Sequence, residues 1–96
     1  MKITINDERY DVEPGSFSFS HSHVPTNARG AKDASKATPA TVEFVCPEVT
    51  KAMRDEWKNL YFGKCVIRFY YRGKEEVGDR LALVSDPQDR LMVWQR

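Results

Sequence analysis

Apolar and polar residues alternate through most of this 96-residue chain. A period of two places successive side chains on opposite faces of a β-strand, so each alternating segment predicts a strand with one buried face. The clearest segment is "CVIRFYYR", in which Cys65, Ile67, Phe69 and Tyr71 share one face. Alternation between turn residues predicts strands at residues 2–5, 9–12, 16–23, 41–46, 65–72, 79–84 and 89–94.

Residues 48–61 differ, because their apolar side chains recur at helical intervals and predict one amphipathic helix. Pro47 suits the first turn of this helix, and Gly63 suits its C-terminal end. The apolar stripe consists of Val49, Ala52, Met53, Trp57, Leu60 and Tyr61, and the opposite side of Lys51, Arg54, Asp55 and Lys58. The expected fold class is α+β: a mainly antiparallel β-sheet, or a small β-barrel or sandwich, with the helix packed against it.

The C-terminal third predicts a closing hairpin, because "DRLALV" and "DRLMVW" are near repeats separated by the turn residues "SDPQ". The preceding "GKEEVGD" is expected to be a turn with Glu75 and Glu76 in solvent. Val84, Met92 and Trp94 are apolar where simple alternation would place polar residues. A sheet covered on both faces would explain them, with the helix on one face and sheet closure or another subunit on the other.

Residues 24–40 interrupt the strand pattern with small and polar residues. The chain is therefore expected to form a single domain, residues 1–96, with a long flexible loop at 24–40. Loops of this length are usually functional or disordered. Arg29, Lys32 and Lys36 make the loop mildly basic, so it is either a solvated loop or one that orders on meeting a partner.

The composition narrows the function classes. A formal net charge of +1 gives no general attraction to nucleic acid or to an anionic membrane. No apolar run is long enough for a membrane span and no signal peptide is evident, which favours a cytoplasmic protein. Cys46 and Cys65 lie in apolar, strand-like contexts and are expected to be reduced packing residues. No motif of an enzyme is present, so no catalytic residue, metal or cofactor is expected.

His21 and His23 share a face of the predicted strand 16–23, with Cα atoms about 6.5–7 Å apart. That spacing can chelate a metal, but a tight site needs three or four ligands. The favoured interpretation is that Phe17 and Phe19 fill the core while the histidines continue the same face to its rim.

The exposed face of strand 65–72 carries Arg68, Tyr70 and Arg72, which suit either nucleic-acid stacking and phosphate contacts or a subunit interface. The RNA-recognition-motif pattern is a poor match, because its Gly-aromatic-Gly core is absent. The candidate binding or interface residues are Arg29, Lys32, Lys36, Arg68, Tyr70, Arg72 and Trp94.

Residues 16–85 resemble, in the order of their elements, the tube-protein family of phage tail tubes and the Hcp (haemolysin-coregulated protein) tubes of type VI secretion. The matching stretches are "SFSFSHS", "ATVEFVCPEVTKAMRDEW" and "GKCVIRFYYRGK". The chain is shorter than typical members, its loop is Ala/Lys-rich, and Pro47-Glu48-Val49 replaces the family's usual helix opening. The resemblance implies subunits that form rings and stack into a tube without catalysis, with residues 24–40 reaching a neighbouring subunit. It also implies a place in the virion if a phage encodes the chain.

We therefore expect a non-enzymatic structural protein that self-assembles, as a homo-oligomeric ring or with a protein partner. The alternative is a small binding module: a phage-type regulator of a host protein, or a nucleic-acid binder through Arg68, Tyr70 and Arg72.

Overall fold

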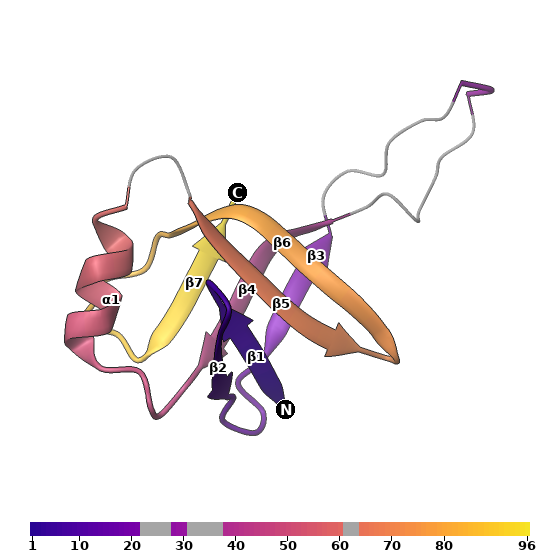
Figure 1. Ribbon diagram of the computed structural model, residues 1–96. Coiled ribbons are helices and arrows are strands. Elements are labelled where there is room, and N and C mark those ends of the chain that lie inside the picture. Colours follow the sequence, from indigo (N-terminus) through magenta and orange to yellow (C-terminus); the bar gives the residue numbers. More distant parts are fainter. Residues whose placement is uncertain (22–27, 31–37, 61–63) are drawn as a thin grey trace.

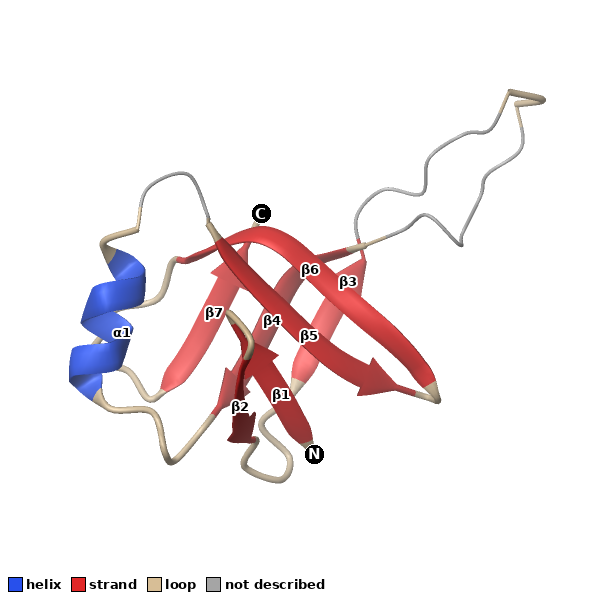
Figure 2. Ribbon diagram, viewed as in Figure 1, coloured by secondary structure: helices blue, strands red, loops and turns tan. Residues whose placement is uncertain are grey.

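The computed structural model describes residues 1–21, 28–30, 38–60 and 64–96 of the chain. These residues form seven strands and one helix, which confirms the α+β class (Figures 1 and 2). The elements are β1 (Lys2–Ile5), β2 (Glu8–Asp11), β3 (Ser18–His21), β4 (Pro39–Val45), α1 (Lys51–Lys58), β5 (Cys65–Tyr71), β6 (Lys74–Leu83) and β7 (Leu91–Gln95).

The seven strands form one antiparallel sheet with the order β2-β1-β5-β6-β7-β4-β3. Strand β6 belongs to both halves, because Lys74–Gly78 pair with β5 whereas Ala82 and Leu83 pair with β7. The β1-β5-β6 half crosses in front of the β7-β4-β3 half (Figure 2). In the described part of the chain the edge strands β2 and β3 do not pair, so the sheet is not closed into a barrel.

Strands β1 and β2 form a hairpin with a tight turn. Asn6 and Asp7 both have positive φ, 51° and 71°, which is the backbone of a type I′ turn. The Asn6 side chain accepts a hydrogen bond from the Val66 N–H at 2.9 Å, and its backbone N–H donates to the Val66 carbonyl at 2.9 Å. The turn therefore fixes β1 against β5 as well as against β2.

The prediction that residues 73–79 form a turn is wrong. The chain reverses at Arg72 and Gly73, whose φ values are 52° and 77°, and β6 begins at Lys74. Glu76 faces the interior and is only 5% exposed, so its predicted place in solvent is also wrong. Alternation of polar and apolar residues did not predict this strand, because "GKEEVGD" is rich in charged residues.

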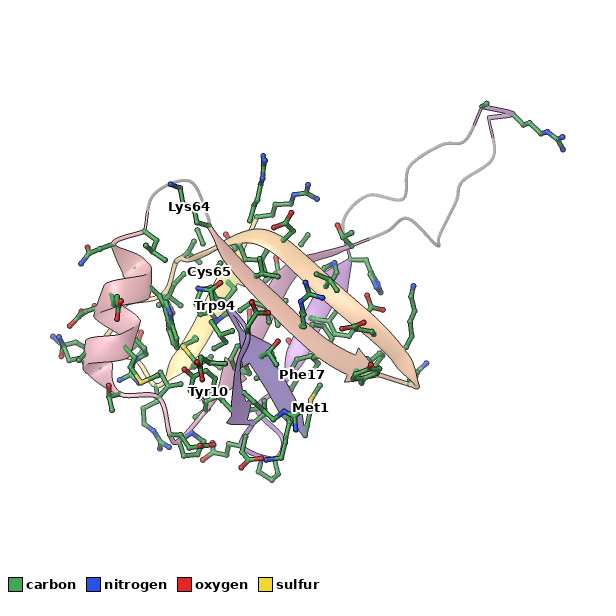
Figure 3. The ribbon with its side chains drawn as sticks, in the orientation of Figure 1. Met1, Tyr10, Phe17, Lys64, Cys65 and Trp94 are labelled. Carbon is green, nitrogen blue, oxygen red and sulfur yellow. The ribbon has the colours of Figure 1, made fainter. Side chains whose placement is uncertain are left out.

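The core lies between the two halves of the sheet. Phe17 and Phe19 pack partly buried against it, and their ring centroids lie 4.9 and 5.0 Å from that of Phe69. Trp94 is fully buried, stacks on Phe44 at 6.5 Å and lies in the interior in Figure 3. The side chains that are at most 1% exposed include Ile3, Ile5, Val42, Phe44, Cys65, Ile67, Leu81, Met92 and Trp94.

Helix α1 is shorter than the predicted 48–61. It begins after Thr50, whose side-chain oxygen accepts the Met53 N–H at 3.2 Å, while Pro47 lies in a turn before it. Met53 and Trp57 pack against the core as predicted, and the Trp57 ring lies 5.7 Å from Trp94. Ala52 and Leu60 are exposed, contrary to the predicted stripe, and Tyr61 and Gly63 lie outside the described residues.

The charged side of the helix does not simply face solvent, because Arg54 is buried. Its guanidinium donates to the Pro87 carbonyl at 2.7 Å and to the Val49 carbonyl at 3.0 Å. The Lys58 ammonium donates to the Val84 and Ser85 carbonyls at 2.9 and 3.0 Å. Arg54 and Lys58 therefore bind α1 to the β6–β7 connection. The helical period predicted this side of α1 to face solvent, and these hydrogen bonds explain why it does not.

Candidate functional site

The outer face of β2, β1, β5 and β6 gathers polar side chains in two rows across the strands. In the first row Thr4 of β1 lies between Arg9 of β2 and Arg68 of β5, because it pairs with both. In the second row Lys2 pairs with Asp11, and Tyr70 pairs with Glu75. The alternation of each strand puts these residues on the face opposite Ile3, Ile5 and Phe69 of the core.

A solvent-open hollow of about 690 Å³ lies over this face. Ile3, Phe69 and Met1 also contribute to its lining, and Met1 directly precedes β1 (Figure 3). The polar and aromatic side chains that line it are Lys2, Thr4, Arg9, Arg68, Tyr70 and Glu75. Three cations therefore face one carboxylate within the hollow.

The three cations of the hollow form only exposed ion pairs or no ion pair at all within the described ranges. Arg68 approaches Glu75 at 3.9 Å, with both side chains about half exposed, and such surface pairs contribute little to stability. Lys2 contacts Asp11 at 2.9 Å, which lowers the pKa of the Asp11 carboxyl. The Arg9 side chain makes no hydrogen bond or ion pair within the described ranges. The hydroxyl of Thr4 is covered and likewise has no hydrogen-bond partner there.

The structure brings two of the predicted site residues together and separates the others. Arg68 and Tyr70 line the hollow, whereas the guanidinium of Arg72 lies 5.3 Å from the ring centre of Tyr71. Arg29 lies in an exposed turn at residues 28–30, away from the sheet (Figure 1). Lys32 and Lys36 lie outside the described residues.

The prediction that Trp94 is a binding or interface residue is wrong. Trp94 is a core residue with none of its surface exposed, so a partner cannot contact it. The alternation of "DRLMVW" places Met92 and Trp94 toward the one core, so they need no second covering layer, whereas Val84 is exposed. The residues of the hollow that the sequence did not single out are Lys2, Thr4 and Arg9. The polar positions of the first hairpin point to them only once β1 is known to pair with β5.

In the described part of the chain, His21 does not belong to a group of metal-ligating side chains. Its Nε2 lies 3.3 Å from Oε2 of the buried Glu76, and its ring packs edge-on against Phe19 at 5.1 Å. His23 lies outside the described residues, and within the described ranges no group of three or more His, Cys, Asp or Glu side chains is placed to hold a metal. His21 thus continues the Phe17/Phe19 face to the rim of the core, as predicted.

Both cysteines are free and buried, as expected for packing residues. Burial, with the carboxylates of Glu48 and Asp11 nearby, raises the pKa of the Cys46 thiol to about 12. Burial also raises the pKa of Cys65, whose sulfur accepts a 3.5 Å contact from the Asn6 amide. Both thiols are therefore protonated at neutral pH, which is the unreactive form.

No protein-family model, curated protein sequence or solved structure matches this chain. None of the described helices is long and apolar enough to cross a membrane.

Proposed function

We propose that this chain is a non-enzymatic structural protein that self-associates by pairing its β3 edge with the β3 edge of a second copy. The observation that supports it is the difference between the two edges of the sheet. An unpaired edge strand is a template for another strand, and proteins that avoid such pairing protect their edges with charges, prolines or covering groups.

The β2 edge is protected. Its four residues include Glu8, Arg9 and Asp11, whose charges oppose the approach of another strand. The Asp11 N–H is also occupied, because it donates to Oε1 of Glu48 at 2.8 Å.

The β3 edge is open. Its sequence, Ser18-Phe19-Ser20-His21, contains no proline and no Asp, Glu, Lys or Arg, and in the described residues it pairs only with β4. Ser18 and Ser20 are exposed and small, so they leave the backbone accessible. Phe19 is held by ring contacts with Phe69 and Tyr71, at 5.0 and 4.9 Å, so the strand is fixed before a partner arrives.

A second copy suits this edge because the strand is compatible with itself. An antiparallel pairing with a two-fold axis through Ser20 sets Ser20 opposite its equivalent and Phe19 opposite the second copy's equivalent of His21. Aromatic cross-strand pairs are stabilising, and this register opposes no like charges. The same open edge is compatible with the tube-like assembly that the resemblance implies. A ring would require β3 to meet a different surface of the next subunit.

Light scattering coupled to size exclusion at several concentrations tests the proposal. The wild-type chain should assemble, as a dimer by two-fold pairing or as a larger ring. Ser20→Lys should be monomeric, because it places like charges opposite each other. Gln88→Lys, which adds the same charge on the exposed β6–β7 connection, is the control and should assemble like the wild type. A wild-type chain that stays monomeric at every concentration would overturn the proposal.

A further inference from the structure

We infer that the hollow over β1 and β5 binds a nucleoside phosphate, with the phosphate between Arg9 and Arg68 and the base stacked on Tyr70. This inference goes beyond self-association and does not depend on it, because the hollow lies on the β2-β1-β5-β6 half and β3 is the far edge of the sheet. It extends the predicted pair Arg68 and Tyr70 of β5 by Thr4 of β1, Arg9 of β2 and Glu75 of β6.

The phosphate position follows from the row Arg9–Thr4–Arg68. Two steps across neighbouring strands put the Cα atoms of the two arginines on the order of 10 Å apart, so their guanidinium groups can converge on one anion. Arg9 has no partner in the described ranges, and Arg68 has only its 3.9 Å contact with Glu75. Guanidinium groups bind phosphate oxygens with paired, charge-assisted hydrogen bonds. Thr4 lines the hollow between the two arginines, and its covered hydroxyl has no hydrogen-bond partner in the described ranges.

The base position follows from Tyr70, which is 68% exposed because it lies on the face of β5 opposite the core residues Ile67 and Phe69. An exposed aromatic ring on a strand is a stacking platform for a nucleobase, and such stacking tolerates any base. Glu75 pairs with Tyr70 across β5 and β6, so its carboxylate stands beside the platform. A carboxylate there can accept a hydrogen bond from an exocyclic amino group of a base.

The size of the hollow agrees with this ligand. About 690 Å³ falls within the roughly 300–1,000 Å³ typical of small-molecule sites, and the hollow combines apolar lining with a few convergent polar groups. The net charge of +1 gives the whole molecule no general attraction to nucleic acid. Binding should therefore come from this local group of cations and disappear when the group is broken.

The test is a titration of ¹⁵N-labelled full-length protein with adenosine monophosphate, inorganic phosphate and a short single-stranded oligonucleotide, followed by amide chemical shifts. Adenosine monophosphate should shift amides of β1 and β5 around Thr4, Arg68 and Tyr70. Arg9→Ala and Arg68→Ala should each weaken its binding by about tenfold. Tyr70→Ala should weaken it, and Tyr70→Phe should retain it. Arg90→Ala, which removes an exposed arginine outside the hollow, should leave it unchanged.

The titrations with the oligonucleotide and with inorganic phosphate show which kind of ligand the hollow binds. Tighter binding of the oligonucleotide assigns the site to single-stranded nucleic acid, and equal or weaker binding assigns it to free nucleotides. Inorganic phosphate that binds as tightly as adenosine monophosphate would overturn the role of Tyr70. Absence of binding at millimolar concentration, or an equal loss in Arg90→Ala, would overturn the whole site. Unchanged far-ultraviolet circular dichroism shows that each variant is folded.

Discussion

Arg54 is the residue that holds α1 to the rest of the fold. Its guanidinium is buried and donates to two carbonyls, those of Pro87 and Val49. Arg54→Met keeps much of the side-chain volume but leaves both carbonyls without their charged donor. We expect the free energy of unfolding to fall by about 2–3 kcal/mol, measured by urea denaturation.

Lys51 is the matched control for Arg54 on the same helix. It forms an exposed pair with Asp55 at 2.8 Å, and such i,i+4 pairs contribute about 0.5 kcal/mol or less. Lys51→Met should therefore leave the urea midpoint nearly unchanged. Equal effects of Lys51→Met and Arg54→Met would contradict the docking role of Arg54.

Cys46 should make the free energy of unfolding depend on pH in the alkaline range. Its pKa in the folded protein is about 12, above the ordinary value of 9.0. Between these values the unfolded chain has lost the thiol proton that the folded chain keeps, so the unfolded state binds fewer protons. The free energy of unfolding should therefore fall as pH rises from about 9 toward 12 and should show no Cys46 contribution below 9. Urea titrations of wild type and Cys46→Ala measure this, because the variant should lose part of the slope.

Strand β6 is the element that bends the sheet. Two residues, Asp79 and Arg80, lie opposite the single Val66 between the pairs Ile67–Gly78 and Cys65–Leu81, which is a β-bulge. Arg80 has φ 56°, a backbone that a β-branched side chain rarely adopts. Arg80→Val should lower the free energy of unfolding by about 1–2 kcal/mol, and Arg80→Gly should not lower it. Thermal denaturation compares the two.

Asp79→Val is the control for the bulge, because Asp79 is the neighbouring exposed residue and has no positive φ. It should leave the melting temperature unchanged or raise it, since valine favours strands. If Asp79→Val and Arg80→Val destabilise equally, the left-handed backbone at Arg80 is not the cause.

Period two was sufficient to locate most strands, because each has one face in a continuous core. The pattern failed in the first half of β6, where exposed Lys74 and Glu75 and the buried carboxylate of Glu76 remove the contrast between faces. The helical period of 3.6 likewise failed for Arg54, because its burial depends on a hydrogen bond to the Pro87 carbonyl of the β6–β7 connection. In both places contacts between distant residues decide burial, and local spacing carries no information about them.

At the scale of the whole molecule, the sequence identified Arg68 and Tyr70 but not the hollow that contains them. The hollow depends on β1 pairing with both β2 and β5, and Ile3 and Phe69, which pair there, lie far apart in the chain. Trp94 shows the opposite error. Trp94 is apolar where simple alternation would place a polar residue, which favoured an interface, but the fold of the sheet buries it against Phe44 and Trp57.

The proposed self-association through β3 would make the stability of the whole molecule depend on its concentration. Unfolding of a dimer separates its chains, so mass action favours the folded assembly as concentration rises. Where the dimer predominates, each tenfold increase should raise the melting temperature by about 3–5 °C. Ser20→Lys should melt at one temperature at all concentrations, close to that of the dilute wild type, because Ser20 is exposed and its replacement leaves the core intact. A wild-type melting temperature that does not change with concentration would show that the open edge of β3 remains unpaired in solution.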